Sequence, residues 1–203
     1  MKGSLHLPLR GAPQQIIYAH QSLYVRSTHT EGEALGLYRF PLHRWSKGEL
    51  EDSKIQESAG LDQLNADLKL NWLEYDAREH SLWAIGEAGA VYTLESEDGE
   101  LNPRGHIELL SDNPKAMFCA QGGLYTLIAV GEDEWVLVHV TSADNSSTAQ
   151  SEVVWRGSLG ESVSLTTTKA GPGVIAVGLS DGRVALWFES LRGSGETWSP
   201  LFA

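Results

Sequence analysis

Segment 178–188 of the chain, GLSDGRVALWF, begins with five residues that match the pattern G-x-S-x-G. In hydrolases this pattern forms a strand, a sharp turn and a helix, and its serine is the catalytic nucleophile, here Ser180. The same residues also fit a β-hairpin, with Asp181 and Gly182 in the turn between two apolar strands. The two interpretations differ in what must follow the turn, which is a helix in the first and a strand in the second.

The residues on both sides of the turn favour the hairpin. Segment 174–177 is an apolar run, and in segment 184–188 large apolar residues alternate with period 2, as they do in a strand. No apolar stripe of helical length follows. We expect Asp181 and Gly182 to supply the left-handed conformations of a type I′ turn. The sequence therefore predicts that Ser180 is a turn residue and not a nucleophile.

The composition is that of a globular protein, and it limits the partners. The chain has 203 residues, of which 41% are hydrophobic and 21% charged, and its formal net charge is −12. Such a charge argues against nucleic acid or an anionic membrane as the principal partner. There is no apolar run of membrane-spanning length or signal-peptide type, and the single cysteine, Cys119, cannot form an internal disulfide. We therefore expect the protein to reside in the cytoplasm or in another reducing intracellular compartment.

Residue spacing gives no support to a metal or cofactor site. The seven histidines are scattered, with no pair three to five residues apart, and Cys119 has no second cysteine with which to bind zinc. The glycine-rich segment 171–173 enters an apolar strand, whereas a dinucleotide-binding loop must open a helix. We therefore expect no cofactor and no bound metal.

The hairpin at 174–188 has three relatives in the chain. Apolar hairpins also start near Leu23, Leu82 and Leu124, so the pattern recurs every forty to sixty residues or so. An apolar strand precedes each hairpin and a weaker strand follows it. In the first unit we expect this weaker strand at 42–45. In the last unit we expect the leading strand at 162–166. The predicted repeat units are 14–57, 70–109, 114–157 and 162–201.

Four units of four antiparallel strands predict an all-β, propeller-like array. A β-sandwich or barrel is the alternative, because it too has many short strands separated by turns. Segment 58–68 places leucines at i, i+3 and i+7, which predicts a short helix that joins units one and two. Three ways of closing the array stay open: pairing of segment 4–9 with the last unit, association of two copies, and completion of a larger ring by a partner protein.

The last unit resembles a blade of the WD-repeat β-propellers, in which an Asp-Gly turn precedes a strand that ends in tryptophan. Here that segment is 181–187, DGRVALW, and the resemblance covers about a dozen residues within 174–188. The chain departs from the WD pattern in two ways: Trp187 is followed by Phe188 and not by aspartate, and no Gly-His pair opens any unit. The resemblance implies a propeller of the WD-repeat type.

Acidic residues concentrate in two sets of loops that propeller topology brings to one face. The connections between units carry Glu57, Asp62, Asp67, Asp112 and Glu161. The candidate partner-binding residues are the acidic residues of the central hairpin turns and one neighbouring aromatic residue: Glu31, Glu33, Glu87, Glu132, Asp133, Glu134, Trp135 and Asp181.

An acidic face of this kind would attract a protein partner with a basic surface. The sequence thus predicts a non-catalytic interaction or scaffold module, either a subunit of a larger assembly or an inhibitor of a basic partner. Two alternative explanations compete with this interpretation. Acidic turns can serve only to keep a β-protein soluble, and Trp135 can equally face the core. The alternative function is a small hydrolase that uses carboxylates or Ser180.

Overall fold

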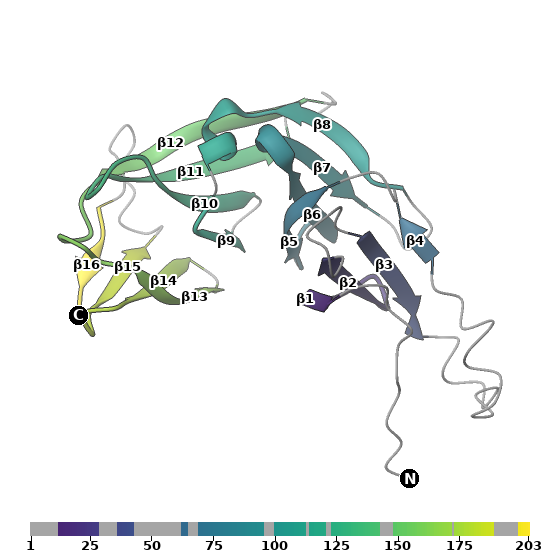
Figure 1. Cartoon of the computed structure of the whole chain (residues 1–203), viewed down its shortest axis with the longest axis horizontal. Coiled ribbons are helices and arrows are strands. Elements are labelled where there is room, and N and C mark those ends of the chain that lie inside the picture. The colour runs from purple at the N-terminus through teal and green to yellow at the C-terminus, as the bar shows by residue number, and fades with distance from the viewer. Residues whose placement is uncertain are drawn as a thin grey trace, which may run out of the picture.

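The computed structural model describes residues 12–28, 36–42, 62–64, 69–95, 100–112, 114–120, 123–142, 148–171, 173–188 and 199–203. The described chain is all-β, with four antiparallel sheets of four strands each. The sheets follow one another along the chain as the blades of a propeller, so the propeller prediction is confirmed over the sandwich or barrel (Figure 1). Among the described residues, no helix has the length and apolar character needed to cross a membrane.

Each blade consists of four consecutive strands that pair in chain order. Blade 1 contains β1 (Ala12–Ala19), β2 (Ser22–Thr28), β3 (Gly36–Pro41) and β4 (Asp62–Leu64). Blade 2 contains β5 (Leu70–Asp76), β6 (Ser81–Gly86), β7 (Ala90–Leu94) and β8 (Asn102–His106). Blade 3 contains β9 (Ala116–Cys119), β10 (Leu124–Ala129), β11 (Trp135–Ser142) and β12 (Ala149–Gly157). Blade 4 contains β13 (Leu165–Gly171), β14 (Val174–Leu179), β15 (Val184–Phe188) and β16 (Leu201–Phe202).

The first strand of each blade is the inner one. β1 packs against β5, β5 against β9, and β9 against β13, so the inner strands follow one another around a common centre. Figure 1 shows the four blades as an arc, with blade 1 and blade 4 at its two ends. Two short 3-10 helices lie in the loops, η2 (Glu87–Gly89) between β6 and β7 and η3 (Glu108–Asp112) between β8 and β9.

The core lies between neighbouring blades, and the alternation of side chains along each strand explains it. In β6, Trp83 and Ile85 point toward blade 3, whereas Leu82 and Ala84 point toward blade 1. A strand that is buried on both faces is mostly apolar, and residues 82–85 of β6 are. Between blades 3 and 4, the rings of Trp155 and Trp187 meet edge to face with centroids 5.4 Å apart.

The hairpin between β14 and β15 turns in a different way from the predicted type I′ geometry. Only Gly182 is left-handed, with φ of +90°, and Asp181 is not. The Gly182 N–H donates to the Leu179 carbonyl at 3.1 Å, and the Leu179 N–H donates to the Arg183 carbonyl at 2.8 Å. This pattern is a type I turn that ends in a left-handed glycine, which spares Asp181 the steric cost of a positive φ. Consecutive left-handed residues occur instead at 20–21, between β1 and β2.

The predicted helix at 58–68 is wrong where the structure describes it. Residues 62–64 form β4, which pairs with β3 through Leu37–Leu64 and Arg39–Asp62. The open backbone of β3 offers hydrogen bonds to a neighbouring strand, and this pairing outweighs a weak helical spacing of leucines. The fourth strand of blade 1 thus lies beyond the expected boundary at residue 57, and segment 43–45 lies outside the described residues.

The inner strand of blade 4 begins later than the predicted segment 162–166. β13 starts at residue 165, and Ser162 belongs to the connection from blade 3, where it adopts a left-handed φ of +55° that is incompatible with a strand. The strand instead continues to Gly171, which pairs with Val174, the first residue of β14. Segment 4–9, whose pairing with the last unit is one of the three ways of closing the array that the sequence leaves open, lies outside the described residues.

Candidate functional site

The central hairpin turns and the connections between blades meet on one face of the propeller, which we call the turn face. Its described parts are the turns 87–89, 130–134 and 180–183, residue 69 and the connections 107–112, 114–115 and 158–164. Hydrogen bonds join the turns to the connections, among them Ile107 N–H to the Gly89 carbonyl at 3.0 Å, Ser162 N–H to Asp133 Oδ1 at 3.3 Å, and Arg183 Nη2 to the Leu159 carbonyl at 2.6 Å. The two acid-rich sets of loops are therefore neighbours, as propeller topology requires.

Several of the predicted carboxylates on the turn face form an ion pair with a lysine or arginine side chain of the same chain. Glu87 lies 3.2 Å from Lys69 Nζ, and Glu134 lies 3.4 Å from Arg156 Nη1. Asp181 accepts hydrogen bonds from Arg183, which lower the pKa of its carboxyl group. Exposed pairs of this kind contribute little to stability, but they reduce the negative charge that a partner would meet.

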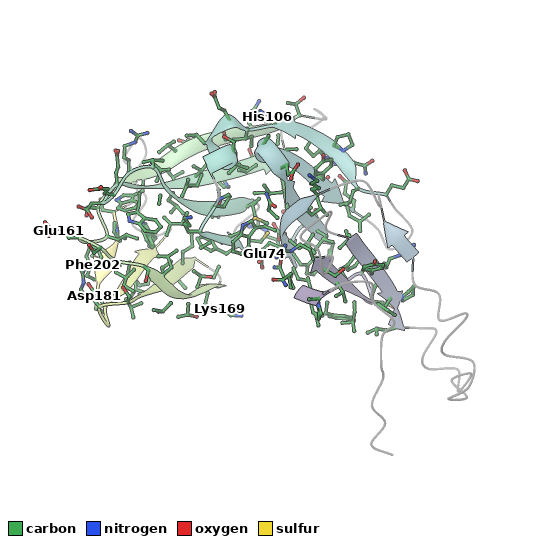
Figure 2. All side chains as sticks on the ribbon, in the orientation of Figure 1. Glu74, His106, Glu161, Lys169, Asp181 and Phe202 are labelled. Carbon is green, nitrogen blue, oxygen red and sulfur yellow. The ribbon has the colours of Figure 1, made fainter. Side chains whose placement is uncertain are left out.

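A group of four acidic residues lies where blades 3 and 4 meet. We call it the acidic cluster, and it consists of Glu132, Asp133, Glu134 and Glu161. Glu132 and Glu161 are exposed, and the hydrogen bond from Ser162 N–H to Asp133 holds the connection against the turn. Figure 2 shows Glu161 and Asp181 at the same end of the molecule. Four carboxylates thus share this corner of the turn face with the side chain of Arg156.

The remaining predicted residues lie elsewhere. Glu31 and Glu33, together with Glu57 and Asp67, fall outside the described residues. Trp135 is only 6% exposed and belongs to the core between blades 3 and 4. This position favours the packing role of Trp135 over the proposed role as an aromatic anchor for a partner.

Ser180 occupies a turn between two strands, as the hairpin interpretation predicted. Its backbone N–H donates to the Ser164 carbonyl at 2.9 Å, and its Oγ accepts from the Ser164 N–H at 3.0 Å. The chain continues into β15 and not into a helix, so the strand–turn–helix geometry of a nucleophile elbow is absent from this part of the described chain. The side chain of Ser180 fastens the turn of blade 4 to the connection from blade 3.

Sequence reasoning missed a recess at the centre of the arc. It has a volume of about 740 Å³ and is lined by the inner strands β5, β9 and β13, with the turn after β5. Glu74 and Lys169, labelled in Figure 2, line it from β5 and β13. Burial raises the pKa of the Glu74 carboxyl to about 7, and the nearby positive charge of Lys169 opposes this shift only in part. The one signal in the sequence was a glutamate between the large apolar residues Leu73 and Tyr75 of an inner strand.

Two other side chains that line the recess, Asp76 and Cys119, are explained by the structure without a catalytic role. Asp76 is 4% exposed, and its Oδ1 accepts hydrogen bonds from the backbone N–H groups of Arg78 and Glu79, which fixes the turn between β5 and β6. Burial and the charges of Glu74 and Asp76 raise the pKa of the Cys119 thiol above its ordinary value. A thiol held in its neutral form is a poor nucleophile. Within the described ranges, no group of histidine, cysteine and carboxylate side chains is arranged to hold a metal ion.

The raised pKa of Glu74 predicts a pH-dependent stability. The folded chain holds this proton up to about pH 7, whereas the unfolded chain releases it near 4.5, so folding loses stability as the pH rises between these values. We expect Glu74→Gln to be more stable than the wild type by about 1–2 kcal/mol at pH 8, with a smaller difference at pH 5.5. Urea unfolding at both pH values measures this effect. The exposed Glu79→Gln is the charge-matched control, and an equal effect of Glu74→Gln at both pH values would contradict the assignment.

Comparison with known proteins agrees with the fold. No family model and no curated protein sequence matches the chain. Among solved structures, the chain is similar to the WD40 domain of SCAP from fission yeast, with a TM-score of 0.53 and 13% identity over 100% of this chain and 46% of that one. It is also similar to YCF48 bound to a D1 peptide, with a TM-score of 0.50 and 15% identity over 97% of this chain and 55% of that one. The chain thus spans about half the length of these two solved chains. Its fold is a β-propeller.

Proposed function

We propose that the chain is a non-catalytic protein-interaction module that binds a basic segment of a partner protein on its turn face. It would act as a subunit of a larger assembly or as an inhibitor that covers a basic site. The observation that carries this proposal is the acidic cluster, in which residues from a hairpin turn and from a connection between blades lie together and exposed. Separate loops that converge in this way form a surface broad enough for a protein.

The electrostatics of the acidic cluster suit the capture of a cationic partner. Arg156 pairs with Glu134, which leaves an excess of negative charge around Glu132 and Glu161. Like charges held close together produce a field that attracts a basic partner and raises its association rate. The hydrogen bond to Asp133 fixes the loop before binding, so less conformational entropy is lost when the complex forms.

The architecture supports the same proposal. One of the two structural neighbours, YCF48, is bound to a D1 peptide, so a chain of related architecture can hold a peptide. The hydrolase alternative has weaker support. The Oγ of Ser180 already accepts a backbone hydrogen bond, and the turn that carries it leads into a strand. The cytoplasmic or other reducing location stays a prediction from the sequence.

The acidic cluster can be tested through association kinetics. The partner is first captured from native lysate with the wild-type chain. Its association rate is then measured with Glu132→Gln/Glu161→Gln at low and high salt. We expect a rate about three- to tenfold slower at low salt and nearly equal rates at high salt, because salt screens exposed charges. Unfolding free energy should change by about 0.5 kcal/mol or less, since both side chains are exposed.

The matched control removes two charges from the opposite face. Glu79 and Glu100 are exposed and lie in loops between β5 and β6 and between β7 and β8, which emerge at the other ends of the strands. The variant Glu79→Gln/Glu100→Gln has the same net charge as the test variant, and it should associate at the wild-type rate. Equal slowing by the two variants would show that overall charge, and not the acidic cluster, governs binding.

A further inference from the structure

Blades 1 and 4 each have one sheet face that no other described blade covers. The inner strands pack in the order β1, β5, β9, β13, and in Figure 1 the blades form an open arc around their common centre. Blade 1 uses one face against blade 2, and blade 4 uses one face against blade 3. We call the two remaining faces the free face of blade 1 and the free face of blade 4.

The free face of blade 1 is apolar. Cross-strand pairing places Ile16 beside Val25, and Tyr18 beside Leu23, on the side opposite to the core with blade 2. Toward the outer strands this face is buried, and Val25 belongs to a separate apolar cluster. On the inner strand it is not, since Ile16 is 60% exposed and Tyr18 is 59% exposed. Two large apolar side chains on a face that is otherwise apolar are a surface suited to burial.

The free face of blade 4 is apolar on its middle and outer strands, whereas its inner strand places the exposed Thr167 and Lys169 on this side. Leu201 lies beside Leu186, which in turn lies beside Ala176, and this row faces away from the core with blade 3. Leu201 is 53% exposed, and Leu186 and Ala176 are only partly buried. Val174 and Phe188 form a second, partly buried apolar pair on the same face. The three contacts between blades within the chain are built from apolar rows of this kind.

We propose that a second copy of the chain covers both free faces and closes an eight-bladed ring. Ile16 and Tyr18 on β1 pack on the free face of blade 4 in the other copy, so the contact continues the packing of inner strands already present in the chain. The outer part of the blade 1 face, with Val25, Tyr38 and Phe40, is already buried within one copy. Two open arcs can complete one ring, and the chain aligns with about half the length of two solved propeller chains. A two-fold axis along the ring axis makes both contacts identical and leaves no free face.

Closure would also complete the central recess and double the turn face. The recess is lined by β5, β9 and β13, and the second copy would supply the missing half of its wall. Because the two-fold axis runs through the ring, the turn faces of both copies point the same way. A partner with two basic segments could then bind both acidic clusters, and this avidity is a further consequence of the dimer. The dimer itself is independent of the proposed function, since its contacts involve other residues.

The mass of the purified full chain in solution tests the proposal. Sedimentation equilibrium at micromolar concentration should give twice the 22.2 kDa mass of one chain. The variant Ile16→Glu/Tyr18→Glu should weaken dimerisation about 100-fold or more, because buried apolar anchors dominate such contacts. These side chains are exposed in a single copy, so the variant should keep the wild-type circular dichroism and a folded monomer. The control Gln150→Glu/Ser151→Glu, which places the same charge on exposed positions of the outer strand β12, should stay dimeric.

A variant on blade 4, at the other end of the arc, tests whether the dimer has the proposed ring arrangement. Thr167→Glu/Leu201→Glu changes two exposed positions on the free face of blade 4, and in the proposed ring it must also disrupt the dimer. When the two disrupted variants are mixed, one of the two contacts is restored, so dimers should partly return. If the wild-type chain is monomeric at 100 micromolar, the proposal is wrong. This holds also if a different protein is then found to cover the free faces. Disruption by only one of the two variants would overturn the ring arrangement.

Discussion

Replacing Trp187 with alanine is expected to lower the free energy of unfolding by about 3–5 kcal/mol, the usual cost of removing a large buried aromatic side chain. Trp187 is fully buried in β15, where it packs against Trp155 in the core between blades 3 and 4. Its loss leaves a cavity that rigid sheets on both sides cannot close. Urea unfolding monitored by far-ultraviolet circular dichroism measures the change.

Trp187→Phe is the informative control for this substitution. Phenylalanine keeps an aromatic ring beside Trp155, and it removes the indole N–H of Trp187, which is buried without a hydrogen-bond partner. We expect this variant to lose less than half as much stability as Trp187→Ala. If alanine and phenylalanine were equally destabilising, or if neither had an effect, the packing of blade 4 against blade 3 would be wrong.

Gly89→Ala is expected to destabilise the chain by about 2 kcal/mol or more, because the backbone of Gly89 lies very close to the backbone of Ile107. Gly89 has a φ of +81°, and a Cβ atom there would overlap the carbonyl oxygen of Ile107. The Ile107 N–H donates to the Gly89 carbonyl at 3.0 Å, so the substitution would separate two segments that a hydrogen bond holds together. Thermal and urea unfolding both measure the loss.

Gly182→Ala separates the effect of dihedral strain from that of the clash. Gly182 has a similar φ of +90°, but a Cβ atom there would have no neighbour within 4 Å. Only the cost of a left-handed alanine remains, about 1 kcal/mol. Equal losses for the two variants would show that the turn after β6 does not press against the connection that follows blade 2.

The repeated hairpins were predictable because their signal is local. Apolar residues with period 2, divided by short turns, predict strands wherever they occur, and four such units imply four blades. β4 was not predictable, because three residues, Asp-Gln-Leu, carry no strand pattern and pair only because β3 presents an open edge. The late start of β13 has a similar origin, since the left-handed Ser162 belongs to a connection shaped by contacts with blade 3.

The candidate site was predictable in its location more than in its chemistry. Topology alone brought the acidic turns to one face, and the acidic cluster followed from it. Sequence could not reveal that Lys69 and Arg183 would pair with Glu87 and Asp181, because ion pairs depend on the relative positions of loops that are distant in the chain or on side-chain geometry within a turn. Nor could it reveal the raised pKa of Glu74, which depends on burial by three blades.

The most direct test of the proposed interaction module is hydrogen exchange of the chain with and without its captured partner. The account predicts slower exchange on binding at the turn 130–134 and the connection 158–164, which carry the acidic cluster. Exchange in the turn 77–80, on the opposite face, should not change. Protection confined to 77–80, or to neither face, would contradict the proposal that the turn face binds the partner.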